Sequence, residues 1–299
     1  ATGGYGNNLE MMEARQPWNQ KMRISIARNG TGGNPTGDGI KAAMWVGGQM
    51  DPIGAACMFN RAAVKPDEKA GDGIVGEWYW FGEQPFMKVN RNGVRFANES
   101  TPYDTLCFQA AQQPGGVWCS IFDANAPEDI IRFSTIGCSA FANQMMAAGM
   151  PLEEFVATSR DAGYLKKADT IEELADKLGF EGESKKAFLE QVERYNQQFD
   201  AQADDDYGKE AYRLSAIRTA PFYGLWFGGT LLTTIDGLRI NSECQVLDEK
   251  GAAIEGFYAA GDVSGSFFSG NYPEYIVGVA SGRSSTQGRH VARKLGGDL

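Results

Sequence analysis

The chain has 299 residues, of which 42% are hydrophobic and 38 are glycine, so it can bury a large core and form one large or two ordinary globular domains. Its formal charge of −10 argues against non-specific nucleic-acid binding, which needs a basic face. A single histidine, His290, and five scattered cysteines without a CxxC motif argue against a metal site and a histidine-based catalytic triad. No run is long and apolar enough to predict a membrane span, and the compartment is left open.

The first fifty residues contain two turns marked by glycine. Residues 1–4 (Ala-Thr-Gly-Gly) have the pattern of a strand end and the turn after it. Asp38 precedes a predicted helix over residues 40–46, which the glycine pair at 47–48 ends. Asp38 is therefore a candidate N-cap, because its carboxylate can accept hydrogen bonds from the first free amides of the helix.

The middle of the chain mixes predicted strands and helices. Residues 86–89 and 94–96 flank an Asn-Gly turn, which predicts a β-hairpin. Residues 117–122 predict a further strand. From residue 51 to 220 this pattern alone predicts an α+β region.

Two helices are predicted in the second half of that region. Thr170 opens a capping box, Thr-Ile-Glu-Glu, and its helix ends at Gly179. Ser184 begins an amphipathic helix that carries an apolar stripe of Leu189, Val192, Tyr195 and Phe199. Residues 201–206, with three aspartates, are predicted to form a solvated turn.

The C-terminal part contains the stretch that points most directly to a ligand. Short strands over residues 237–240 and 245–248 lead to an apolar run at 257–260, which predicts a buried strand. Gly261 and Asp262 follow at its end, where open α/β sheets place their ligands. A glycine- and serine-rich loop then leads to small apolar residues from Ile276 onward, where a helix is predicted to begin. An ordinary strand-to-helix turn is the alternative interpretation.

Four ordered stretches together resemble the flavoprotein family of fumarate reductase and succinate dehydrogenase, which includes urocanate reductases and 3-ketosteroid dehydrogenases. The stretches are residues 1–6 (ATGGYG), 36–40 (TGDGI), 93–99 (GVRFANE) and 256–262 (GFYAAGD, with aspartate for the usual glutamate). The resemblance implies an α/β fold, part of a Rossmann-like FAD-binding domain formed by residues 1–50 and 221–299. Residues 51–220 would be an inserted α+β capping domain.

The resemblance also implies FAD as the cofactor and a set of residues that hold it. Gly3 and Gly4 would line the adenosine side, and Gly261 and Asp262 would bind the ribityl hydroxyls. The backbone amides of Ile276 and Val277 would face the N1/O2 edge of the flavin, where helix-start amides stabilise negative charge. For Asp38 two interpretations are possible: it caps the helix only, or it lies close to the flavin. A plain turn is the alternative role of Gly3 and Gly4.

The substrate positions depart from those of fumarate reductases. Tyr103 stands where those enzymes have the arginine that delivers the proton, and Tyr272 stands where they have a substrate-binding arginine. Their histidine position falls near Thr233 and Thr234. A dicarboxylate would lose several charge-assisted bonds here, so fumarate is not the expected substrate.

Tyr272 and Pro273 instead resemble the Tyr-Pro of 3-ketosteroid dehydrogenases, where a tyrosine hydroxyl holds the substrate ketone. Tyr272 is thus expected to polarise a carbonyl and Tyr103 to donate a proton, with Tyr275 as a third candidate catalytic residue. Aromatic packing is the alternative role of all three.

The leading hypothesis is an FAD-dependent reductase or dehydrogenase acting on a small molecule with a C=C bond conjugated to a carbonyl. The electron donor stays open among a haem domain, a quinone, a second flavin and a soluble carrier. No GxGxxG following a strand is present, so the expectation is a fragment, or a half-protein that pairs with a second chain carrying that unit. The alternatives are a non-catalytic binding or assembly module that does not hold FAD alone, and a flavin used in non-redox chemistry such as hydration.

Overall fold

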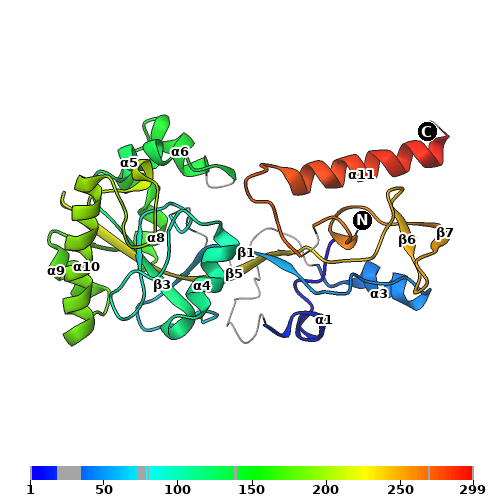
Figure 1. The fold of residues 1–299 in the computed structure, drawn as a ribbon, viewed down its shortest axis with the longest axis horizontal. Helices are drawn as coiled ribbons and strands as arrows, with labels where there is room; N and C mark the ends of the chain where they lie inside the picture. Colours follow the sequence, from blue (N-terminus) through cyan, green and yellow to red (C-terminus); the bar gives the residue numbers. More distant parts are fainter. Residues whose placement is uncertain are drawn as a thin grey trace. The chain divides into compact units, whose positions relative to one another are not determined.

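The computed structural model describes residues 2–18, 35–72, 79, 81–137, 140–268 and 270–297, and these form two compact units (Figure 1). As far as they are described, residues 2–18, 35–58 and 231–297 form unit 1, and residues 59–230 form unit 2. The divisions fall inside two long strands, β1 (Ala56–Val64) and β5 (Phe222–Thr234). The expected mixture of helices and strands is confirmed, whereas the assignment of residues 51–220 to a capping domain stays a prediction.

Unit 1 combines a small sheet with amphipathic helices. Strand β6 (Gln245–Leu247) pairs antiparallel with β7 (Ala253–Tyr258), and a short 3-10 turn, η4 (Gly261–Val263), follows β7. The helices are α1 (Leu9–Arg15), α3 (Asp38–Trp45) and α11 (Val279–Gly296), the last of which packs on η4. The core joins segments from both ends of the chain and includes Tyr5, Met12, Ile40, Ala43, Leu231, Leu238, Val246 and Val263.

Unit 2 contains the main sheet, with strand order β1-β5-β3-β2 and β4 (Lys166–Ala168) paired with β5. Strand β3 (Val117–Phe122) pairs antiparallel with β2 (Met87–Val89) and with β5, so Cys119 lies opposite Val89 on one side and Trp226 on the other. Every residue of β3 is buried, which explains why five of its six residues are apolar and do not alternate with polar ones.

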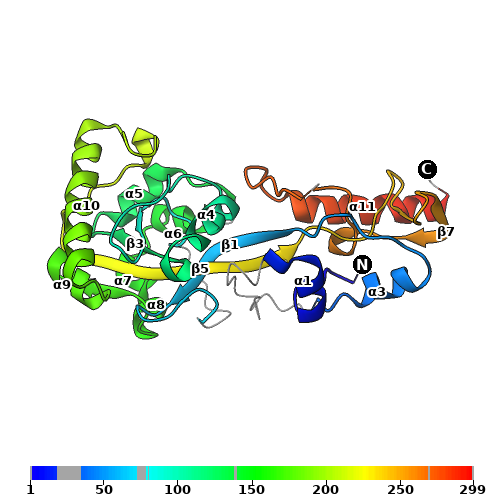
Figure 2. The same ribbon diagram turned by 60° about the horizontal axis from the view of Figure 1, so that its bottom comes forward.

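Helices surround this sheet within unit 2. They are α4 (Tyr103–Ala111), α5 (Ala126–Phe133), α6 (Ala140–Ala147), α7 (Leu152–Phe155), α8 (Ala157–Asp161), α9 (Ile171–Lys177) and α10 (Gly182–Ala201). Helices α9 and α10 lie side by side (Figures 1 and 2). Trp226 of β5 packs against Phe180 and donates its indole N–H to the carbonyl of Leu178 at 3.0 Å, so the connection between these helices is held on the core.

Several local predictions are confirmed. The strand at 117–122 has the predicted bounds, and Thr170 caps α9 by accepting a hydrogen bond from the amide of Glu173. Gly179 adopts φ +82° at the end of that helix. The turn before Val94 is present, with Gly93 at φ +79°, but the returning strand of the hairpin is reduced to one bridge between Val89 and Arg95.

Other predictions are wrong in an informative way. Gly37, in the left-handed conformation, is the N-cap of α3, and Asp38 is its first helical residue. Helix α10 begins at Gly182 because Glu181 and Ser184 form a capping box. Helix α11 begins at Val279 rather than Ile276, after Gly278 at φ +77°. Residues 201–203, 205 and 206 are exposed, as predicted for a solvated turn, but Asp204 is buried and ion-paired with Arg95.

Candidate functional site

In unit 1 the N-terminal turn lies against the start of α3. The amide of Gly37 donates to the carbonyl of Gly4 at 3.1 Å. A Cβ on Gly39 would lie 2.0 Å from the hydroxyl oxygen of Thr2, so glycine at this position permits the close approach of the two segments. The structure thus brings Gly3, Gly4 and the exposed Asp38 into one neighbourhood. The carboxylate of Asp38 accepts a hydrogen bond from Thr36 and pairs with Lys41, and these contacts lower its pKa.

The same turn also meets the end of β5 and the residues after β7. A Cβ on Gly4 would lie 2.0 Å from Oγ1 of Thr234 and 3.7 Å from the carbonyl oxygen of Asp262. The amide of Tyr5 donates to Oγ1 of Thr234 at 3.3 Å. Two predicted positions, Gly4 and Asp262, are therefore neighbours although the sequence separates them by most of its length.

Asp262 is a partly buried carboxyl group in this neighbourhood. Burial raises its pKa, while the positive charge of Arg283 and a hydrogen bond with Thr233 act in the opposite direction. Gly261 precedes it at φ +78°, a conformation that side chains other than glycine rarely adopt. The arrangement presents an acid at the end of a strand, beside a hydroxyl group and a glycine turn.

The loop that follows Asp262 is held in place by residues to which the sequence analysis gave no role. The buried guanidinium of Arg283 donates to the carbonyl of Gly261 at 2.9 Å and to the hydroxyl of Ser264 at 2.6 Å. Phe267 and Phe268 stack on it, with 5.2 and 5.1 Å between the guanidinium carbon and the ring centroids. Burial lowers the pKa of Arg283, with the charge of Asp262 opposing the shift.

Asp51 fixes the other side of this loop. Its carboxylate accepts a hydrogen bond from the amide of Ser266 at 2.9 Å. A Cβ on Gly265 would lie 1.9 Å from the Asp51 carboxylate, so glycine is needed for the contact. Neither Asp51 nor Arg283 is marked by a local motif, because the partners of each lie in a distant segment.

The segment after the loop exposes apolar side chains. Phe267, Tyr275, Ile276 and Val277 are all at least half exposed, and the ring of Tyr272 packs on Phe268 with 5.1 Å between centroids. The amide of Ile276 donates to the carbonyl of Pro273 at 2.9 Å within a turn that precedes α11. This exposed apolar segment, residues 272–277, contains four of the predicted site residues.

Tyr103 is the one predicted site residue in unit 2. It begins α4, and its ring packs edge-on against Phe59 with 5.2 Å between centroids. The described residues contain no group of three or more His, Cys, Asp or Glu side chains that could hold a metal ion. Nor does any helix within the described ranges have the length and apolarity to cross a membrane.

The chain is similar to a known protein family and to several curated proteins. The family described as FAD binding domain matches residues 1–275. A vinyl phenol reductase of Lactiplantibacillus plantarum is 30% identical over 98% of the chain and 59% of its own length. An NADH:acrylate oxidoreductase of Vibrio harveyi is 28% identical over 91% of the chain and 24% of its own length. The chain thus spans only part of the curated relatives that it matches.

Solved structures show the same fold at lower identity. The open conformation of a flavocytochrome c3 fumarate reductase aligns with TM-score 0.66 and 23% identity over 97% of the chain and 44% of that protein. The 3-ketosteroid Δ1-dehydrogenase of Sterolibacterium denitrificans aligns with TM-score 0.69 and 23% identity over 99% of the chain and 52% of that protein.

Proposed function

The chain belongs to the FAD-binding domain family, and on this premise we propose that it is part of an FAD-dependent oxidoreductase that reduces or forms a C=C bond conjugated to a carbonyl. The resemblance drawn from the four sequence motifs is confirmed by this membership, and FAD is the cofactor of the family. The observation that carries the proposal is that Gly4, Thr233 and Asp262 lie close together in unit 1. The exposed apolar segment, residues 272–277, follows Asp262 in the chain.

The residues of unit 1 fit part of FAD. The Asp262 carboxylate and the Thr233 hydroxyl suit the hydroxyls of a ribityl chain, and Gly3 and Gly4 offer a surface without side chains. Tyr275, Ile276 and Val277 provide apolar surface for a flat ring. When bound, FAD supplies hydride transfer, and the protein supplies binding and orientation.

The phosphate groups of FAD lack an obvious site in the described residues. The letters GxGxxG do occur at residues 71–76, but Gly71 and Asp72 belong to a turn of unit 2, and residues 73–76 lie outside the described residues. We therefore propose that a further segment, in the same polypeptide or in a second chain, supplies the pyrophosphate site.

Two surfaces of unit 1 support this proposal. Within α11 only Arg283 is buried, and β7 pairs with β6 and with no other described strand. A helix of 18 residues with one buried side chain gains little from packing, so its exposed face suits a covering element.

The chain's own side chains are given the following roles. The Tyr272 hydroxyl would donate a hydrogen bond to the substrate carbonyl oxygen, and the Tyr103 hydroxyl would give its proton to the carbon opposite the hydride. Thr233 and Thr234 stand near the place of the fumarate reductase histidine, and their hydroxyls bond to Asp262 and to the amide of Tyr5. Neither side chain carries a positive charge that could bind a carboxylate. This supports a substrate other than fumarate.

The vinyl phenol reductase among the relatives favours a second candidate, a C=C bond conjugated to a phenol ring without a carbonyl. Both candidate substrate classes are tested with one panel of an enone, an acrylate, a vinyl phenol and fumarate. Reduced viologen serves as the electron donor, so that the natural electron donor is not needed. Bleaching of the viologen with the enone or acrylate, and a fall in kcat of about 100-fold in Tyr272→Phe, is the expected result. Turnover of fumarate alone would overturn the proposal, and turnover of the vinyl phenol alone would select the second candidate.

The panel needs a protein that holds FAD. Absorbance spectra with added FAD decide this point when the 299-residue chain alone is compared with the complete protein. Binding only in the second case supports a separate pyrophosphate segment, whereas flavin bound by the chain alone would refute it. A complete protein that binds no FAD would favour an assembly module instead.

A further inference from the structure

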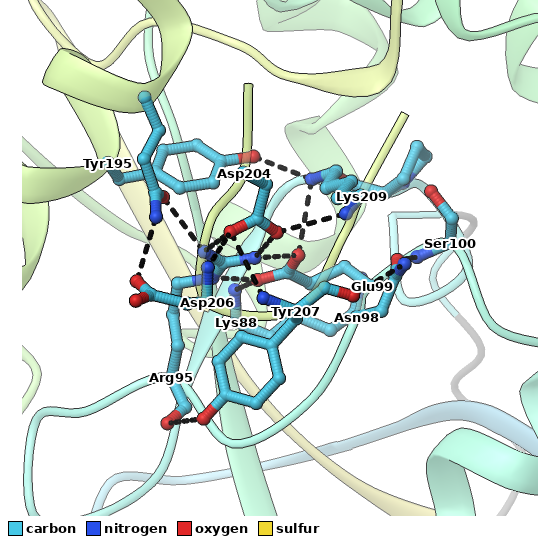
Figure 3. Close-up of polar contacts among 12 residues, drawn as sticks. Lys88, Arg95, Asn98, Glu99, Ser100, Tyr195, Asp204, Asp206, Tyr207 and Lys209 are labelled. Carbon is cyan, nitrogen blue, oxygen red and sulfur yellow. Dashed lines mark hydrogen bonds and ion pairs between the residues drawn. The ribbon is translucent and has the colours of Figure 1, made fainter. Parts of the chain in front are cut away.

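A cluster of five charged side chains is buried in unit 2 (Figure 3). This buried ion cluster consists of Lys88, Arg95, Glu99, Asp204 and Lys209, each at most 7% exposed. It holds three basic and two acidic side chains far from water, where an unpaired charge is strongly unfavourable. Such a cluster fixes the segments that contribute to it, because moving any one of them would leave charges unpaired.

Arg95 is the centre of the cluster and joins two distant segments. Its guanidinium binds Glu99 through Nε at 2.7 Å and Nη2 at 2.9 Å. The same group binds Asp204 through Nη1 at 3.1 Å and Nη2 at 2.8 Å. Both contacts are two-pronged, which fixes orientation as well as distance.

The loop from Asp204 to Lys209 adds further contacts to the segment 95–99. Lys209 pairs with Glu99 at 3.3 Å, and its amide donates to Asp204 at 3.1 Å. The hydroxyl of Tyr207 donates to the carbonyl of Arg95 at 3.0 Å, and the side-chain amide of Asn98 donates to the carbonyl of Tyr207 at 3.3 Å. The loop therefore holds both the side chains and the backbone of this segment.

Only a tight turn separates Glu99 from Tyr103. The side-chain oxygen of Asn98 accepts a hydrogen bond from the amide of Ser100 at 2.8 Å. The backbone carbonyl of Asn98 accepts hydrogen bonds from the amide and the hydroxyl of Thr101 at 3.2 and 2.9 Å. Pro102, with its fixed φ, then precedes the first residue of α4, Tyr103. The position of Glu99 is thus transmitted to Tyr103 through a short, internally bonded turn.

We propose that the loop of residues 204–209 positions Tyr103, acting through Arg95 and Glu99, and that Asp204 and Tyr207 are positioning residues for the proton-transfer step. The catalytic half of this inference rests on the proposed role of Tyr103 as proton donor. Phe59 of β1 packs against the ring of Tyr103, while the cluster and the amide of Lys88 in β2 hold Glu99, which lies just before the turn to Tyr103.

The first test measures the positioning itself. Hydrogen–deuterium exchange of the first turn of α4 is compared among wild type, Asp204→Asn and Tyr207→Phe, with Asp200→Asn as the matched control at an exposed carboxylate paired with Arg218. We expect exchange at residues 103–106 to rise about tenfold in the first two variants, and α9 and the control to keep wild-type rates. Unchanged exchange in Tyr207→Phe, which removes a single hydroxyl from a partly exposed residue and should fold, would overturn the inference.

The second test asks whether the position matters for catalysis in the FAD-loaded protein. With a substrate identified by the panel, Asp204→Asn should lower kcat at least tenfold with KM within about twofold, and should raise the solvent deuterium isotope effect. A conservative Asp204→Glu should recover part of kcat. Raised exchange with wild-type kcat and isotope effect would refute the role of Tyr103 in the proposed function, because the tyrosine would have moved without consequence.

Discussion

The contact between Gly4 and Thr234 is the place where the N-terminal turn of unit 1 is most sensitive to one added methyl group. In Gly4→Ala the new Cβ would lie 2.0 Å from Oγ1 and 3.3 Å from Cβ of Thr234, inside normal contact distance. Thr234 is 2% exposed and ends β5, so it has little room to yield. We expect the substitution to push the turn away from β5 and from Asp262.

The structure sets the size of this effect. Overpacking of this kind costs about 1–3 kcal/mol, and separating the amide of Tyr5 from Oγ1 of Thr234 leaves a buried donor unpaired for about 1–3 kcal/mol more. Because the two costs overlap, about 2–4 kcal/mol is expected in total. The double variant with Thr234→Ala removes the clashing oxygen but not the unpaired amide, so it should recover about 1 kcal/mol.

Urea unfolding followed by circular dichroism measures these values. Gly288→Ala is the matched control, because it lies within α11 and a Cβ there meets nothing within 4 Å. The control should be neutral or stabilising by up to about 1 kcal/mol, as is usual for this exchange in an exposed helix. If Gly4→Ala costs no more than the control, or if Thr234→Ala gives no recovery, the packing described for this turn is wrong.

Three further outcomes are expected. In urea unfolding, Arg95→Met should lower the free energy of unfolding by about 3–5 kcal/mol, because two buried carboxylates lose their main partner. The control Lys177→Met breaks an exposed pair with Glu173 and should lower it by less than about 1 kcal/mol, so equal losses would contradict the burial of the cluster. Burial lowers the pKa of Lys88 to about 7, so between pH 7 and 10.5 the unfolded chain binds more protons than the folded protein. The free energy of unfolding of the wild type should therefore rise by about 1.5 kcal/mol from pH 7 to 8.5 relative to that of Lys88→Met. Parallel pH profiles of the two proteins in urea unfolding would refute this. Asp262→Asn should weaken FAD binding by the complete protein about tenfold in a fluorescence titration, because charge-assisted hydrogen bonds to the ribityl hydroxyls become neutral ones. An unchanged Kd would show that Asp262 does not bind the cofactor.

Local chemistry was enough to predict several elements and the family. The short, mostly apolar run at 117–122 predicts a buried strand, and Thr170 with Glu173 encodes the start of α9. Gly261 and Asp262 were predicted at a strand end because glycine marks the turn, and the structure places them in η4, which follows the end of β7 at Tyr258 after two residues. Ordered motifs also indicated the flavoprotein family.

The details of the site were decided by partners far away in the chain. Asp204 belongs to an acidic run that looks solvated, yet it is buried because Arg95, 109 residues earlier, neutralises it. Arg283 is the only buried residue of α11. It is buried because η4 and the loop after it pack against its side chain. Local windows of sequence report propensity and turn chemistry, whereas the burial of a charge depends on whether an opposite charge meets it in three dimensions. The sequence by itself therefore determined the strand at 117–122, the cap of α9 and the family of this protein. Only the tertiary structure decided which polar residues are buried and which segments they hold together.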